Sequence, residues 1–109
     1  MAELELVRSD YGYDLEFTIL DARGGAVDLN NATVKLKVKK YGATSLTIDS
    51  GCDRKMPYSS GIVTYTVQQT DFSAIGKYQG ELEITWTGGK VMTATDLEIS
   101  IVADLVGAA

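Results

Sequence analysis

The sequence predicts an all-β protein in which two layers of strands pack around one hydrophobic core. Three observations favour this fold class. Apolar and polar residues alternate with period two in several segments, as they do in strands that have one buried and one solvated face. Clusters of turn-forming residues separate these segments at intervals of about 8–12 residues. No stretch has the period of about 3.6 residues that marks an amphipathic helix.

The segment 76–86 has the clearest pattern and is predicted to be the central strand. Its apolar row contains Tyr78, Leu82, Ile84 and Trp86, and its polar row contains Gln79, Glu81, Glu83 and Thr85. We expect the apolar row, including the Trp86 indole, to lie in the core. Gly80 interrupts this row, which indicates a β-bulge or a close approach of another part of the chain.

Six further strands are expected. They cover about residues 3–8, 14–21, 32–41, 45–49, 61–68 and 90–102. The first is short and charged, which suits an edge strand because charges discourage stray pairing. The apolar rows of the longer strands contain Leu15, Phe17, Ile19, Val34, Leu36, Val38, Val63, Tyr65, Val67, Leu97, Ile99 and Ile101. Residues 50–60 hold the only proline and are expected to form a surface loop.

This arrangement is typical of an immunoglobulin-like β-sandwich of about seven antiparallel strands. Tyr78, just past Gly76, resembles the tyrosine that closes a corner in immunoglobulin domains. The 109 residues contain neither a repeat nor a linker. We therefore expect a single domain, 1–109.

Composition and charge argue against several classes of function. The chain is 45% hydrophobic and 23% charged, which favours a folded domain. The formal charge of −5 disfavours nucleic-acid binding. Histidine is absent, so the commonest general base and metal ligand is missing. We expect neither an enzyme nor a metal or other cofactor.

Cys52 is the only cysteine, so no disulfide can form within the chain. It is expected to be an ordinary free thiol in the loop at 50–60. The charged start of the chain does not resemble a signal peptide. No apolar run approaches the roughly 20 residues that cross a bilayer, so no membrane association is expected.

Two groups of residues are candidates for a protein interface. The first is a basic stripe formed by Lys35, Lys37, Lys39 and Lys40. It is either a docking patch for an acidic partner or a solvated strand face. If the strand 32–41 neighbours the central one, these lysines can lie opposite Glu81 and Glu83. The second group comprises Tyr11, Tyr13, Met56 and Tyr58, which are either interface anchors in loops or local packing residues.

Five aspartates lie at predicted turns: Asp21, Asp28, Asp49, Asp53 and Asp71. Turn aspartates can hold Ca²⁺ through their oxygens. Their spacing matches no calcium-binding loop, so hydrogen bonding to turn backbone is the better interpretation.

Several short segments, in this order, resemble a known family. They are DYGYDLEFTILD at 10–21, Asp28-Leu29, ATVKLKVKK at 32–40, GIVTY at 61–65 and GKYQGELE at 76–83. Together they are similar to the N-terminal immunoglobulin-like domain of phage baseplate upper proteins. The resemblance covers roughly residues 9–102.

The resemblance implies a virion structural protein of a tailed phage, in the tail or baseplate, the neck or the head surface. It would be assembled in the host cytoplasm, dock other virion proteins, support fibre attachment and form a homo-oligomer in the particle. The alternative is a receptor- or carbohydrate-binding module on a phage tail or cell surface. That alternative needs an exposed aromatic platform, which Trp86 supplies only if it lies outside the core.

Overall fold

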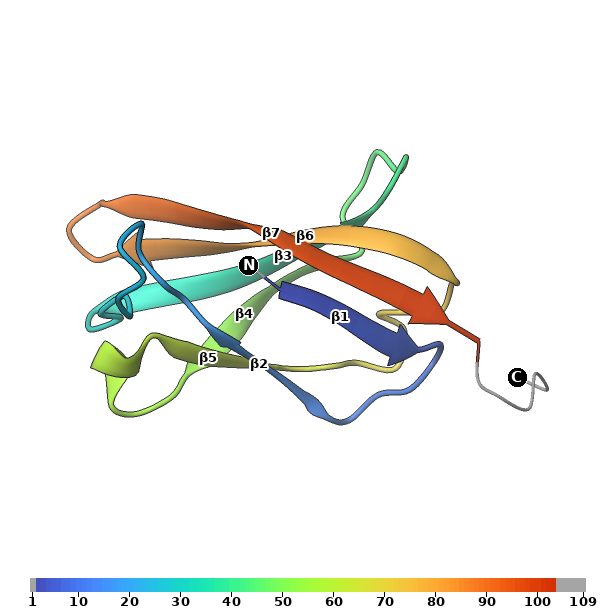
Figure 1. The fold of residues 1–109 in the computed structure, drawn as a ribbon, viewed down its shortest axis with the longest axis horizontal. Helices are drawn as coiled ribbons and strands as arrows, with labels where there is room; N and C mark the ends of the chain where they lie inside the picture. Colours follow the sequence, from blue (N-terminus) through green and yellow to red (C-terminus); the bar gives the residue numbers. More distant parts are fainter. Residues whose placement is uncertain (1, 104–109) are drawn as a thin grey trace.

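A computed structural model describes residues 2–103, and these residues form an all-β fold (Figure 1). The strands are β1 (Ala2–Val7), β2 (Asp14–Thr18), β3 (Ala32–Lys40), β4 (Ile48–Arg54), β5 (Ile62–Thr66), β6 (Gly76–Trp86) and β7 (Val91–Val102). A single 3-10 turn, η1 (Tyr58–Ser60), precedes β5. The all-β prediction is therefore confirmed.

The seven strands form one continuous sheet in the order β1-β7-β6-β3-β4-β5-β2. β6 is an interior strand that pairs antiparallel with β3 on one side and β7 on the other, as expected of the central strand. β4 pairs with β3 from Ile48 to Cys52 and then with β5 through Asp53 and Arg54. The sheet curls at β4, so β5 and β2 lie across from β3, β6 and β7 (Figure 1).

The prediction that all strands are antiparallel is wrong for β1, which runs parallel to β7. Leu4 pairs with Ile99 and Leu6 with Ile101. β1 and β7 are far apart in sequence, so no hairpin dictates their relative direction. Backbone bonds continue the contact beyond β1, since the Arg8 amide donates to the Val102 carbonyl oxygen at 2.8 Å.

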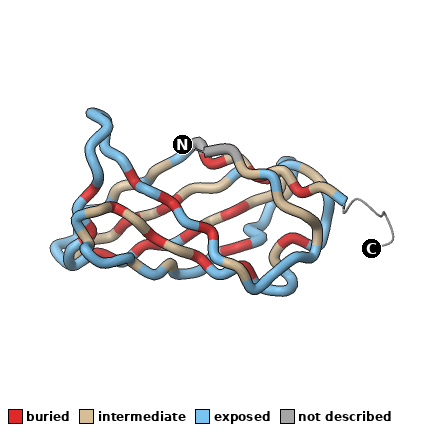
Figure 2. The backbone as a smooth tube through the Cα atoms, turned by 60° about the horizontal axis from the view of Figure 1, so that its bottom comes forward, coloured by how far each residue is buried: buried red, intermediate tan, exposed pale blue. Residues whose placement is uncertain are grey.

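The core lies between the two halves of the curled sheet. Along the strands, buried and more exposed positions alternate (Figure 2). Twenty buried apolar residues form one cluster, which includes every apolar-row residue predicted for the strands except Trp86. None of the polar or charged side chains whose burial is described lies in the core. This alternation explains why the sequence pattern located the core correctly.

Tyr78 and Phe72 close one corner of this core. Their rings meet edge to face, with centroids 5.5 Å apart. The Tyr78 hydroxyl donates a hydrogen bond to the carbonyl oxygen of Ala74 at 2.8 Å. The bond to backbone a few residues upstream is the one expected of a corner tyrosine.

Gly80 lies at the predicted irregularity. The register shifts here, since Gly80 pairs with Leu97 but Leu82 pairs with Ala94. A Cβ atom at Gly80 would lie 3.0 Å from Leu97 Cδ2 and 3.3 Å from Val38 Cγ2. Aliphatic side chains therefore occupy the space that a side chain at Gly80 would need.

Two expectations are corrected. Trp86 is only partly buried and packs against the margin of the core, because it ends β6 where the sheet opens to solvent. The predicted loop at 50–60 begins late, since β4 continues to Arg54 and carries Cys52 in a strand. Pairing with β3 overrides the weak strand propensity of Ser50 and Gly51, and pairing with β5 overrides that of Asp53.

Candidate functional site

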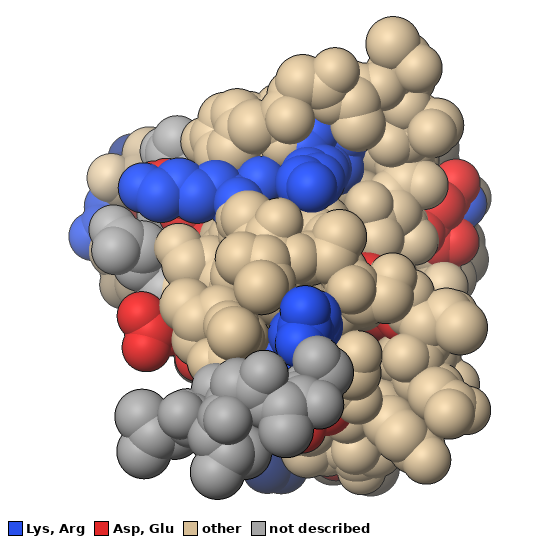
Figure 3. Space-filling view, turned by 90° about the vertical axis from the view of Figure 1, so that its right-hand side faces the viewer, with Lys and Arg blue, Asp and Glu red and all other residues tan. Residues whose placement is uncertain are grey.

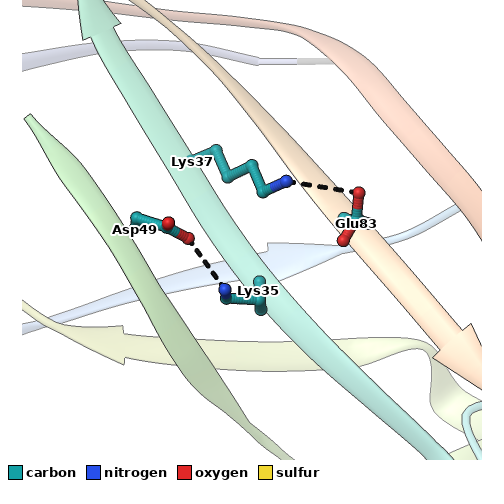
Figure 4. A network of polar contacts seen from close by, with 4 residues as sticks. All are labelled: Lys35, Lys37, Asp49 and Glu83. Carbon is teal, nitrogen blue, oxygen red and sulfur yellow. Dashed lines mark hydrogen bonds and ion pairs between the residues drawn. The ribbon is translucent and has the colours of Figure 1, made fainter. Parts of the chain in front are cut away.

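Lys35, Lys37 and Lys39 of the basic stripe lie on the outer face of the sheet, in the predicted register. Lys40 does not, because strand alternation places it on the same face as the buried Val38, at the end of β3. Lys35 pairs across the strands with Glu83, and Lys37 with Glu81. The ion pairs do not join these directly opposite residues (Figure 4). One runs diagonally from β3 to β6, and the other joins β3 to β4, its neighbour on the other side. Lys37 Nζ lies 3.3 Å from Glu83 Oε2, and Lys35 Nζ lies 3.0 Å from Asp49 Oδ1. Carboxylates of the chain itself thus neutralise these two lysines.

Lys39 and Lys40 differ from the rest of the stripe, because neither forms an ion pair with a side chain that the structure describes. They lie where β3 ends and β6 begins, and the adjacent Tyr41 amide donates to the Lys77 carbonyl oxygen at 3.1 Å. Figure 3 looks onto this end of the molecule. Lysine and arginine atoms form a band across it, below a protrusion of uncharged atoms. Among the described side chains, the unpaired positive charge of the stripe therefore lies at this end.

A groove of about 490 Å³ runs over the outer face of the sheet beside this end. Its lining residues are Lys37, Lys39, Tyr41, Leu46, Gln79, Gly80, Glu81, Thr95, Leu97 and Glu98. Tyr41 and Leu46 belong to the connection at 41–47, which stands out from the sheet (Figure 1). Tyr41 is 52% exposed and Leu46 is 45% exposed. These two residues were not among the predicted interface residues, although apolar residues near Gly42 in a turn were the available signal.

The structure does not bring Tyr11, Tyr13, Met56 and Tyr58 together. The first two precede β2 and the last two precede β5. Because β2 and β5 are antiparallel, the two pairs lie at opposite ends of these strands. Tyr11 and Met56 are exposed, at 55% and 77%. Tyr13 and Tyr58 pack against the core.

Tyr58 also carries the guanidinium of Arg54 over its ring, 4.1 Å from the centroid. Local packing and this cation–π contact account for its position. Whether any of the four loop residues contacts a partner stays a prediction.

A second cleft, of about 600 Å³, lies between the connection at 19–31 and the hairpin that joins β6 to β7. It is lined by Asp21, Ala26, Val27, Asp28, Asn30, Trp86, Lys90 and Met92. The Trp86 indole Nε1–H donates to the backbone carbonyl oxygen of Asp28 at 3.2 Å. Lys90 Nζ lies 5.1 Å from the indole centroid. The alternating pattern of β6 predicted the indole in the core, so this cleft was not predicted.

Three of the turn aspartates hydrogen-bond local backbone amides, as predicted. Asp21 Oδ1 accepts from the amides of Arg23 and Gly25, at 2.9 and 3.0 Å. Asp28 Oδ1 accepts from the Asn30 amide at 3.0 Å. Asp71 Oδ2 accepts from the Gln68 amide at 2.8 Å and also from the Tyr65 hydroxyl. Among the described residues, no three Cys, Asp or Glu side chains gather as a metal site.

The pKa values of Cys52 and Tyr65 are raised strongly. Burial, reinforced by the nearby Asp53 charge, raises the pKa of the Cys52 thiol to about 12. Burial and then the hydrogen bond to Asp71 raise the pKa of the Tyr65 hydroxyl far above its ordinary value. A thiol that stays protonated is a poor nucleophile.

Within the described part of the chain, helices are too short and polar to traverse a membrane.

Comparisons with known proteins give one family match. The family model described as "BppU N-terminal domain" matches residues 10–109. No curated protein matches the chain. Among solved structures, CopC from Methylosinus trichosporium OB3b is similar, with a TM-score of 0.53 and 12% sequence identity. The similarity covers 96% of this chain and 90% of CopC, and at this identity it concerns the fold alone.

Proposed function

Because the chain belongs to the BppU N-terminal domain family of phage baseplate proteins, we propose that it docks neighbouring virion proteins in a tailed-phage particle. Its role in this proposal is structural and non-enzymatic. The docking surface is the groove beside the connection at 41–47, together with the end of the sheet that carries Lys39 and Lys40.

The exposure of Tyr41 and Leu46 is the observation that carries this proposal. Aromatic and aliphatic side chains that stand out from a fold beside a groove are typical of interface anchors. They lie next to the lysines that form no ion pair with a described side chain. A partner with an apolar patch bordered by carboxylates would complement this surface.

Three further parts of the proposal concern architecture and place. The curled sheet is proposed to be immunoglobulin-like, which the corner bond from Tyr78 to Ala74 supports. The copies are proposed to form a homo-oligomer within the particle and to support fibre attachment. Location in the baseplate is preferred over the rest of the tail, the neck or the head because of the family match.

The alternative function is recognition of a receptor or carbohydrate through Trp86. The indole does lie partly exposed in a cleft, as that function requires. However, Lys90 lies over the ring, and the indole N–H already bonds to Asp28. A neutral sugar would have to displace the ammonium group to stack on the ring, so the docking function is favoured.

Incorporation into particles tests the proposal. Phages carrying the substitutions Tyr41→Ser and Leu46→Ser together should yield folded protein that is lost from purified particles. Leu20→Ser, at an exposed position outside the groove, should be incorporated like the unsubstituted chain. The proposal fails if the unsubstituted chain is absent from purified particles. Saturable binding of the isolated chain to host cells or glycans, with no binding to virion proteins, would favour the alternative.

A further inference from the structure

The cleft beside Trp86 has spare negative charge. Asp21 and Asp28 line it, and each uses its Oδ1 atom for turn amides. Their Oδ2 atoms accept no hydrogen bond from the described residues, and neither carboxylate has an ion pair there. Lys90 is the one basic residue in the lining. Two carboxylates against one ammonium group favour a further cation in the cleft.

The Trp86 ring faces this space and already interacts with a cation. Lys90 Nζ lies 5.1 Å from the ring centroid, within the range of a cation–π contact. The hydrogen bond from the indole to the Asp28 carbonyl oxygen holds the ring plane in place. A ligand that stacks on the ring therefore meets a side chain that needs no further ordering.

Apolar side chains complete the cleft. Ala26, Val27 and Met92 line it beside the indole. A ligand with a flat cationic head and an aliphatic stem fits this combination of an aromatic ring, apolar walls and carboxylates. The guanidinium of arginine has that form, because it is planar, stacks on aromatic rings and pairs with two carboxylate oxygens at once.

We propose that the Trp86 cleft receives an arginine side chain presented by a neighbouring virion protein, in place of Lys90. The guanidinium stacks on the indole and pairs with the Oδ2 atoms of Asp21 and Asp28. The identity of the partner as a virion protein rests on the proposed function, whereas the arginine chemistry rests on the cleft. This site lies apart from the groove at Tyr41 and Leu46 and has the opposite charge preference.

Titration of the chain with short capped peptides tests the proposal. The peptides Ac-Gly-Arg-Gly-NH₂, its lysine counterpart and its citrulline counterpart are compared by two-dimensional NMR and by fluorescence of Trp86, the only tryptophan. Saturable shifts should appear around Trp86 and Asp28 with the arginine peptide. Binding should be at least several-fold weaker with lysine and ten-fold weaker with citrulline, which is isosteric but neutral.

Three variants separate a binding role from a structural one. Asp21→Asn together with Asp28→Asn keeps the Oδ1 acceptors of both turns and should weaken arginine binding about ten-fold, or 1.4 kcal/mol. Asp10→Asn, an exposed matched control, should leave it unchanged. Lys90→Gln removes the competing ammonium group and should strengthen binding several-fold, which a merely structural lysine would not do.

The proposal is overturned if arginine and citrulline peptides bind equally, if neither binds, or if Lys90→Gln weakens binding. Saturable binding of neutral sugars at Trp86, without arginine binding, would also overturn it and would assign the cleft to carbohydrate recognition. Failure here is distinguishable from failure of the proposed function. If the chain is incorporated into particles but does not bind the arginine peptide, only the proposal for the Trp86 cleft is contradicted. If the chain binds the arginine peptide but is absent from particles, only the proposed virion role is contradicted.

Discussion

The Trp86 indole nitrogen donates a hydrogen bond to the backbone carbonyl oxygen of Asp28, and the two atoms are 3.2 Å apart. The residues are 58 positions apart in the sequence, so this bond ties the end of β6 to the connection between β2 and β3. It also explains how an indole at the margin of the core stays oriented. The same contact therefore contributes to stability and shapes the cleft.

Trp86→Phe should lower the free energy of unfolding by about 1 kcal/mol, because it removes this hydrogen bond while keeping an aromatic ring. Denaturant unfolding followed by circular dichroism measures the change without the fluorophore. An unchanged midpoint and slope would show that the indole N–H contributes nothing to the fold.

Gly80→Ala should destabilise the protein by about 1–3 kcal/mol, because the added methyl group meets Leu97 and Val38 at 3.0 and 3.3 Å. Gly88→Ala is the matched control, since a Cβ atom there meets nothing within 4 Å. It should change the free energy of unfolding by less than about 0.5 kcal/mol. Equal effects of the two substitutions would contradict the close packing at Gly80.

The sequence located most of the fold because its apolar rows alternate. The register of β3 against β6 was also predictable, since a row of lysines on one strand and glutamates on the other favours pairing. The glycine at position 80 predicted the irregularity next to β7. These features are local, or they depend on the pattern of charge along two strands.

Features that depend on tertiary contacts escaped prediction. Nothing in the short segment Ala2–Val7 specifies that its partner is the last strand or that the pair is parallel. The strand at Ser50–Arg54 has weak intrinsic propensity and forms because β3 and β5 flank it. The Trp86 cleft depends on how far the core extends along β6, which alternation alone does not reveal.

The Lys37–Glu83 ion pair should contribute little to stability. Its side chains are 26% and 31% exposed, and its atoms are 3.3 Å apart. A double-mutant cycle with Lys37→Ala and Glu83→Ala should give a coupling energy of a few tenths to about 1 kcal/mol. The value should decrease as sodium chloride is raised, because salt screens partly exposed charges. A larger coupling energy that does not change with salt concentration would contradict the prediction that this ion pair contributes little.

Stability should decrease at alkaline pH because of Cys52. Its pKa in the folded state is raised from 9.0 to about 12, so folding favours the protonated thiol. That contribution is complete below pH 9 and is lost as the pH rises toward 12. The difference in unfolding midpoint between pH 7 and pH 11 should be smaller in Cys52→Ala. If both proteins lose the same stability, the thiol is not the cause.

Thiol labelling gives an independent check on the same residue. At pH 8, the folded chain should react with a disulfide reagent far more slowly than the unfolded chain does, because burial disfavours the thiolate. Equal rates in the two states would show that Cys52 is neither buried nor perturbed.

Lysine crosslinking of purified particles, read by mass spectrometry, shows which surface of the chain faces other virion proteins. Crosslinks are expected from Lys39 or Lys40 to another virion protein, because these lysines lie beside the proposed docking groove. Lys55, which is paired with Glu16 on the opposite half of the sheet, should crosslink to that protein much less. Crosslinks confined to the chain itself, or predominantly from Lys55, would contradict the docking surface.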